Sequence, residues 1–181
     1  MGRRGWASRR QPASGSQTAM SVAAGIRAWR QPGDCVLVSI HWGDNWGYGI
    51  PDAQRRFAHQ LIDAGAADII HGHSSHHAKG IEVYERKLIL YGCGDFINDY
   101  EGIGGYEAYN PDLAVAYFPE VDERSGSLTS LELAVFQHER FSLMRAGTGE
   151  QDWVQRALSR ECERLGSTLE ASPTGALRLR W

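Results

Sequence analysis

The feature that most constrains the fold is an apolar strand, a helix and a second apolar strand joined by short connections. Residues 35–40 (Cys-Val-Leu-Val-Ser-Ile) form the compact, β-branched run typical of a buried strand. Residues 52–64 carry apolar side chains at helical spacing and end before Gly65, and residues 68–70 form a second strand. A unit of this kind with tight joints places its two strands parallel and adjacent. The sequence therefore predicts an α/β fold.

The rest of the chain supplies enough elements for one domain. With 181 residues, of which 42% are hydrophobic, the chain suits a single core. Residues 1–17, which include four arginines, are expected to be a disordered basic tail, and residues 18–181 one folded unit. The patterns predict helices over 20–29 and 152–165, a hairpin of 81–84 with 88–91, strands over 113–118, 128–137 and 141–145, and a half-exposed edge strand over 176–181.

Charge and apolar content exclude several classes of protein. The formal net charge of −3 gives no global basic field for nucleic acid, so none is expected as a partner. No apolar run is long enough for a signal peptide or a membrane span, so the chain as written is expected to be soluble and cytoplasmic. The three cysteines show no metal-binding or redox spacing and are expected to be reduced.

Histidines gather directly after the two strands of the strand–helix–strand unit. His41 follows the first strand, and His71, His73, His76 and His77 follow the second. Because the carboxyl ends of adjacent parallel strands open on one crevice, these side chains are expected to converge. Neutral imidazole is the common nitrogen ligand of Zn, Mn and Fe, so the cluster predicts a divalent metal site, its metal unidentified. His59 and His138 are expected to have ordinary structural roles.

Three histidines would leave open positions on a metal ion, and catalytic sites of this kind normally include carboxylates. The candidates are Asp44 and Asp95, the second of which follows a Gly-Cys-Gly turn. Asp95 either points into the crevice as the catalytic carboxylate or caps the residues after it. Trp42 and Trp46 either wall a pocket for a large ligand or cap the core.

Several segments resemble the CapA family of capsule and poly-γ-glutamate biosynthesis proteins, which have a metallophosphatase-like fold. The resemblance runs without a gap from about residue 34 to residue 100. It rests on residues 38–43 (Val-Ser-Ile-His-Trp-Gly), 62–70 (Ile-Asp-Ala-Gly-Ala-Ala-Asp-Ile-Ile), 72–76 (Gly-His-Ser-Ser-His), 79–84 (Lys-Gly-Ile-Glu-Val-Tyr) and 91–96 (Tyr-Gly-Cys-Gly-Asp-Phe).

The resemblance implies His41, His73 and His76 as ligands of a Mn, Fe or Zn ion. Family members often read Gly-His-His-Pro-His where this chain reads Gly-His-Ser-Ser-His, so one His and the Pro of the family pattern are replaced. His71 and His77 are therefore reserve candidates for the ligand pair. Asn45 stands where the family usually has an acidic residue, and is grouped with Trp42 and Trp46 as substrate-binding. Asp95 stands where the family usually has Asn.

The implied fold is the second half of a calcineurin-like metallophosphatase-type sandwich: the βαβ unit, the hairpin, further strands and a C-terminal helix. The family's early Gly-Asp, Asn-Leu-Glu and Asn-Asn-His motifs are absent, and no Asp or Glu precedes Asp34. The chain is therefore expected to be a member truncated at its N-terminus, and cell-envelope associated if a signal or anchor is missing there.

The implied function is capsule or poly-γ-glutamate biosynthesis through a metal-dependent, phosphoesterase-like hydrolase site, active only if the missing half is supplied. Its partner would be an anionic polymer or a phosphoester. The alternatives are a non-catalytic module that binds or assembles the polymer, and an inactive remnant. Missing strands would also expose an apolar sheet edge, so self-association or binding of an N-terminal partner chain is expected.

Overall fold

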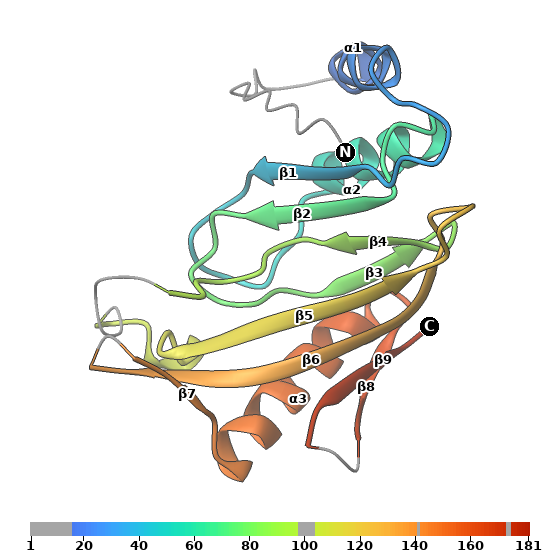
Figure 1. The fold of residues 1–181 in the computed structure, drawn as a ribbon. Helices are drawn as coiled ribbons and strands as arrows, with labels where there is room; N and C mark the ends of the chain where they lie inside the picture. The colour runs from blue at the N-terminus through green and yellow to red at the C-terminus, as the bar shows by residue number, and fades with distance from the viewer. Residues whose placement is uncertain (1–15, 98–103, 141, 173–174) are drawn as a thin grey trace.

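The computed structural model describes residues 16–97, 104–140, 142–172 and 175–181, and places them in two sheets and three α-helices (Figure 1). The first sheet has the order β1-β2-β4-β3 and contains β1 (Leu37–His41), β2 (Ile69–His73), β4 (Lys87–Leu90) and β3 (Ile81–Tyr84). Strands β1, β2 and β4 run parallel, and β3 is antiparallel to β4. The predicted parallel pair and the predicted hairpin are both confirmed.

A two-residue turn closes the hairpin of β3 and β4. Glu85 and Arg86 have φ angles of 48° and 62°. Two successive left-handed residues match the right-handed twist of the flanking strands, which is why hairpins of this length prefer such a turn.

The second sheet is antiparallel and contains β5 (Leu113–Val121), β6 (Leu128–Glu139), β7 (Ser142–Arg145), β8 (Thr168–Ala171) and β9 (Leu177–Arg180). Its order is β5-β6-β9-β8, with β7 also paired to β6. The half-exposed pattern predicted for the C-terminal strand is confirmed, but its edge position is wrong. Strand β8 pairs with the other side of β9. It was not predicted, because its four residues alternate too weakly between apolar and polar to indicate a strand.

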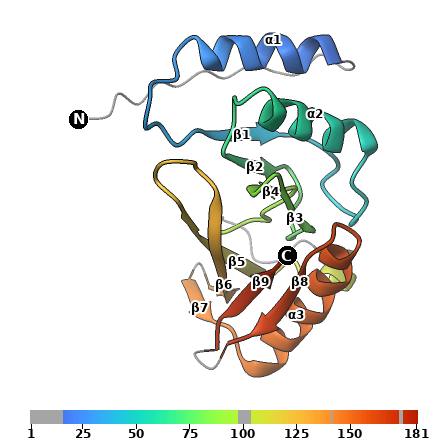
Figure 2. The same cartoon turned by 90° about the vertical axis from the view of Figure 1, so that its right-hand side faces the viewer.

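Two helices cover the outer face of the first sheet, and the third packs into the core that the two sheets share (Figure 2). Helix α2 (Asp52–Asp63), with α1 (Ser16–Arg27) packed against it, covers one face of the first sheet. Helix α3 (Thr148–Glu163) packs mainly on β8 and also contacts β3. The predicted disordered tail lies outside the described residues, except for Ser16 and Gln17, which begin α1. The mixed α/β architecture is thus confirmed, and within the described ranges no helix is long and apolar enough to span a bilayer.

The opposite face of the first sheet meets the second sheet and α3 in a larger core. Leu88 and Leu90 of β4 contribute to this core with Leu131 and Leu133 of β6 and Leu158 of α3. Lys87 of β4 also joins the two sheets at one end. The ammonium of Lys87 lies 2.6 Å from Asp68 Oδ1 and also donates a hydrogen bond to the carbonyl of Ser125 in the β5–β6 turn.

The core between the two sheets leaves part of the first sheet uncovered. Leu37 and Ser39 of β1 face the same side as the core residues of β4, yet Leu37 is 56% exposed and Ser39 is exposed. Strand β1 is also the first strand in the sheet order, and within the described residues it pairs only with β2. The histidines therefore lie at the part of the sheet that is least covered.

Candidate metal centre

The parallel ladder places His41 and His73 side by side. They are register partners at the carboxyl ends of β1 and β2. Their Nδ1 atoms are 3.3 Å apart, and the two rings meet edge to face at 66°. The convergence predicted for these two histidines therefore comes from the strands themselves, because the strand ladder fixes both backbones.

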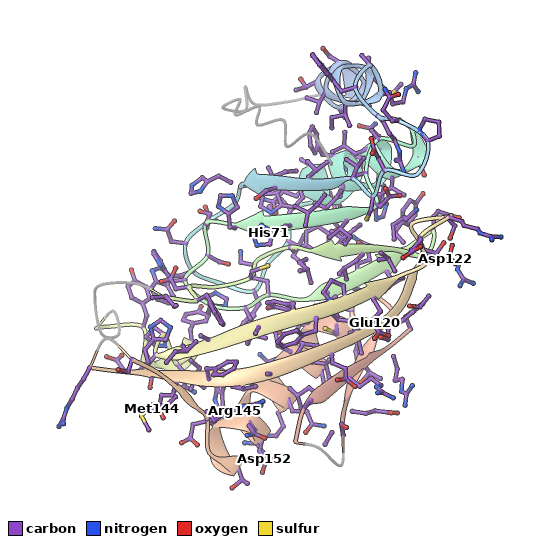
Figure 3. All side chains as sticks on the ribbon, viewed as in Figure 1. His71, Glu120, Asp122, Met144, Arg145 and Asp152 are labelled. Carbon is purple, nitrogen blue, oxygen red and sulfur yellow. The ribbon has the colours of Figure 1, made fainter. Side chains whose placement is uncertain are left out.

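Strand β2 extends through His73, three residues further than its apolar run predicts. His71 and His73 are two apart in an extended strand and so lie on the same face. Their ring centroids are 5.6 Å apart, and His71 Nδ1 lies 3.0 Å from Ser39 Oγ. His71, labelled in Figure 3, thus adds a third imidazole to this face.

Burial favours the neutral form of His71 and of His73. It lowers the pKa of His71 below its usual value. The pKa of His73 is also lowered, first by burial and then by repulsion from His71 and His41. Neutral imidazole is the form that binds a metal ion.

Gly72 lies between His71 and His73 within β2. It does not turn the chain, because it lies inside β2. A Cβ at this position would lie 2.6 Å from the carbonyl oxygen of Tyr91 and 2.7 Å from that of Leu90, and would also overlap the indole nitrogen of Trp42. The glycine therefore permits close approach of β2 to the neighbouring strand and to Trp42.

His76 is paired with Asp95. The distance from His76 Nδ1 to Asp95 Oδ2 is 2.9 Å. The backbone nitrogen of His76 donates to the carbonyl of Asn45, 3.0 Å away, which ties the histidine loop to the loop after β1. Ser74 turns this loop with a φ angle of 135°, a strained value for a residue with a side chain. Its hydroxyl donates to the carbonyl of Gly43 at 3.2 Å.

Asp95 thus lies against the histidine loop. A carboxylate hydrogen-bonded to one imidazole nitrogen fixes the tautomer and orientation of the ring. This arrangement suits an orienting role for Asp95. Asn45, by contrast, is exposed, and its side-chain oxygen lies 3.3 Å from the hydroxyl of Ser74.

Trp46 is the centre of an aromatic cluster next to His76. It stacks on Tyr106 with ring centroids 4.0 Å apart and an interplanar angle of 3°, and lies 5.2 Å from the ring of His76. His77 packs between Trp46 and Tyr109, at 6.0 and 4.6 Å. Tyr106 and Tyr109 were missed in the sequence because they lie in a Gly-rich loop, although their spacing of three within a 3-10 turn places both near Trp46.

His77 is not exposed to a ligand in this arrangement. Its ring is buried, and Nδ1 lies 3.0 Å from the carbonyl of Ala78. Burial lowers the pKa of His77 to about 4. The reserve role of His77 therefore gives way to packing within the aromatic cluster.

Trp42 lies in the core and does not wall a pocket. It is 5% exposed, stacks on Tyr91 at 5.9 Å and packs edge to face on Phe57. Its indole nitrogen donates to the carbonyl of Tyr91 at 2.9 Å, and its backbone nitrogen donates to the carbonyl of His73 at 2.9 Å. Trp42 thus holds the ends of β1 and β2 in place from behind.

Tyr91 is held in turn by a buried carboxylate. Its hydroxyl donates to Glu82 at 2.5 Å. Arg55 and His59 of α2 approach the other oxygen of Glu82 at 2.9 and 3.1 Å. His59 also stacks on Tyr84 with ring centroids 3.7 Å apart. His59 was expected to have an ordinary structural role, and these contacts join α2 to the first sheet.

The separation of the first two histidines can be compared with metal coordination. Two nitrogens each about 2.05 Å from a tetrahedral Zn²⁺ ion lie about 3.3 Å apart. The observed distance between His41 Nδ1 and His73 Nδ1 is 3.3 Å, so this pair fits two positions of such a site. In the part of the chain that the structure describes, no group of three or more His, Cys, Asp or Glu side chains is arranged to hold a metal ion. The fit therefore rests on the pair.

Comparison with known proteins adds a family. A family model described as "Bacterial capsule synthesis protein PGA_cap" matches residues 2–100. A probable polyglutamine synthesis accessory protein of Mycobacterium tuberculosis (strain CDC 1551 / Oshkosh) is 43% identical over 170 residues, which cover 94% of this chain and 44% of that protein. The PGA biosynthesis protein CapA of Bacillus subtilis (strain 168) is 44% identical over 66 residues, or 36% of this chain and 17% of CapA. The chain thus spans less than half the length of these relatives.

Proposed function

Because the chain belongs to the PGA_cap family of bacterial capsule synthesis proteins, we propose that it forms part of a metal-dependent hydrolase site of the phosphoesterase type. Its substrate would be an anionic polymer of the cell envelope or a phosphoester. The similar proteins named for polyglutamine synthesis and PGA biosynthesis support poly-γ-glutamate as the polymer. The observation that carries the proposal is the His41–His73 pair, with ring nitrogens 3.3 Å apart.

In this proposal His41 and His73 hold a Mn, Fe or Zn ion, and His76 is the third ligand. A bound ion would act as a Lewis acid that stabilises an oxyanion and activates water. Asp95 holds Nδ1 of His76, so that Nε2 is directed away from the carboxylate. The role that we propose for Asp95 is therefore to position His76.

The fold proposed for residues 18–181 is part of a calcineurin-like metallophosphatase-type sandwich. Two features support it: the two sheets share a core, and α1 and α2 cover the outer face of the first sheet. A third is the position of the histidines at the carboxyl ends of parallel strands. Ligands of open α/β sheets usually bind at such ends.

A second candidate function is a module that binds the polymer without cleaving it. The stacked pair of Trp46 and Tyr106 favours this reading, because Tyr106 remains 39% exposed. Aromatic rings with one accessible face suit contact with the backbone of an extended polymer. In this reading the histidine pair would anchor the ligand through a metal ion.

One experiment separates the two functions. The purified chain is titrated with Mn²⁺ and Zn²⁺ by calorimetry, its metal content is measured by mass spectrometry, and it is then assayed with 4-nitrophenyl phosphate and with poly-γ-glutamate. Stoichiometric metal and hydrolysis of either compound support the hydrolase. Metal and polymer binding without hydrolysis support the binding module. Absence of metal binding would overturn both.

A further inference from the structure

Lys79 is a buried lysine to which the functions above assign no role. It follows the isolated bridge between Ala78 and Cys93, and its backbone nitrogen donates to the carbonyl of Gly92 at 2.8 Å. Its side chain packs along Gly92, where a Cβ would lie 3.0 Å from Lys79 Cγ and 3.1 Å from Cδ. The aliphatic part of Lys79 is therefore held in one direction by the backbone around it.

The ammonium group has no partner within the described ranges. Lys79 is only 4% exposed, yet it makes no side-chain hydrogen bond and no ion pair with any residue there. The other lysine of the chain, Lys87, is paired with Asp68. Lysines are rarely this buried without a partner. The position of Lys79 is thus hard to explain as a contribution to stability.

The surroundings of Lys79 belong to the candidate site. Its charge acts on His77 in the loop after β2 and is acted on by Asp44 in the loop after β1. Burial lowers the pKa of the amine, while the negative charge of Asp44 acts in the opposite direction. These loops begin directly after His41 and His73. Lys79 therefore brings a positive charge to the end of the sheet where the histidines lie.

We propose that the Lys79 ammonium binds an oxyanion of the substrate, a carboxylate or a phosphate. The inference rests on the proposed function in taking the histidine pair as the reacting end of the site. A compact ammonium forms its strongest hydrogen bonds with anionic oxygens, and a buried setting strengthens them. The two sources of such oxygens, a glutamyl side chain and a phosphoryl group, share this chemistry.

The test measures anion binding in the absence of added metal. The full chain is titrated with γ-glutamylglutamate and with inorganic phosphate, followed by calorimetry and by amide NMR shifts at residues 43–49 and 77–79. Lys79→Met retains the length of the stem without the charge, and Lys79→Arg retains the charge. Arg56→Met, which removes an exposed cation of α2, is the matched control.

We expect the wild-type chain to bind at least one anion and Lys79→Met to weaken that binding at least tenfold. Lys79→Arg is expected to remain within about threefold, and Arg56→Met to be unchanged. Preference for the dipeptide identifies a carboxylate as the ligand, and preference for phosphate a phosphoryl group. Binding of neither anion by the wild-type chain, or unchanged binding by Lys79→Met, would overturn the proposal.

Metal binding by the same variant separates the anion-binding proposal from the proposed function. Lys79→Gln replaces Lys79→Met in the titrations if the methionine variant does not fold. Mn²⁺ affinity is expected to be the same in Lys79→Met and in the wild-type chain. Failure of the wild-type chain to bind Mn²⁺ would count against the proposed function and would leave the anion titration interpretable.

Discussion

The carboxylate of Asp95 lies 2.9 Å from Nδ1 of His76, across a glycine-rich turn from the strand that precedes it. The Gly-Cys-Gly turn that precedes Asp95 is thereby joined to the loop that carries His76. Carboxylates that hold the second nitrogen of an imidazole influence metal sites without touching the metal. Asp95 is therefore expected to matter through the orientation of His76.

Replacing Asp95 with Asn should weaken binding of Mn²⁺ or Zn²⁺ by about 10–100-fold, the usual effect of losing an orienting partner. The His76 ring should also change its tautomer distribution, which ¹⁵N NMR of the imidazole reports directly. Asp152→Asn, at an exposed position of α3, is the control. Unaltered metal affinity together with an unaltered His76 spectrum would contradict the orienting role.

Replacing either His41 or His73 with Ala should lower metal affinity more than tenfold, because each removes one of two facing nitrogens. Calorimetric titration with Zn²⁺ measures the effect. His138→Ala on β6 lies in the second sheet and should retain wild-type affinity. Equal affinities for the three variants would show that the histidine pair does not hold the ion.

Gly72→Ala should destabilise the fold by at least about 2 kcal/mol, because the added methyl group has no space between β2, Tyr91 and Trp42. Gly25→Ala makes the same chemical change in α1, where nothing lies within 4 Å of the new atom. That control should be stabilising by up to about 1 kcal/mol. Urea denaturation followed by tryptophan fluorescence measures both. A Gly72→Ala protein as stable as the wild type would refute the close approach inferred here.

Stability should fall in acid partly because of Asp68, which is 1% exposed. Burial alone would raise the pKa of its carboxyl group, but hydrogen bonds from Lys87, the Val36 amide and Arg30 hold it below the usual value. Their contribution is complete above about pH 4, the pKa range of an unfolded Asp, and is lost as the pH falls through the lower folded value.

Asp68→Asn should therefore cost about 3 kcal/mol at pH 7, and this difference from the wild type should shrink below about pH 4. Urea denaturation of both proteins at pH 7 and pH 3 tests this. The exposed Asp152→Asn variant should show a small difference at either pH. A constant deficit for Asp68→Asn at both pH values would contradict the assigned ionisation.

Strand β1 should mediate self-association. The carbonyl of Val36 and the amide of Trp42 both bond to β2, so by alternation the backbone groups of Leu37, Ser39 and His41 face the open side. Sedimentation velocity should show oligomers that Leu37→Lys shifts toward monomer, because charge on an edge strand blocks pairing. Met144→Lys, an exposed change on β7, should have no such effect. A monodisperse wild-type monomer would contradict the expectation.

Long periodic segments made much of the fold predictable. The α2 helix, the parallel pair and the β3–β4 hairpin follow from apolar spacing and a short polar turn. The end of β2 did not follow, because His71 and His73 carry no apolar signal even though the ladder with β1 continues through them. Backbone pairing, and not side-chain type, determines where that strand ends.

The convergence of His41 and His73 was predictable from the sequence, but the contacts of the residues around them were not. Spacing after two strands selected His41 and His73, and the ladder between them brings the two together. Trp42 was grouped with ligand contacts because aromatic residues in a Gly-rich loop look exposed. Its indole instead finds a hydrogen-bond acceptor in the carbonyl of Tyr91, and that distant partner is invisible in local sequence.

The buried Glu82 has a mechanical consequence. It receives Arg55 and His59 from α2 on one oxygen and the hydroxyl of Tyr91 on the other, and Tyr91 supports Trp42 behind the histidine edge. Each member of this series is packed or hydrogen-bonded to the next, so none can shift alone. Phe57 of α2 also packs directly on Trp42. The position of α2 is thus tied through Glu82, Tyr91 and Trp42 to the end of β2 that carries His73.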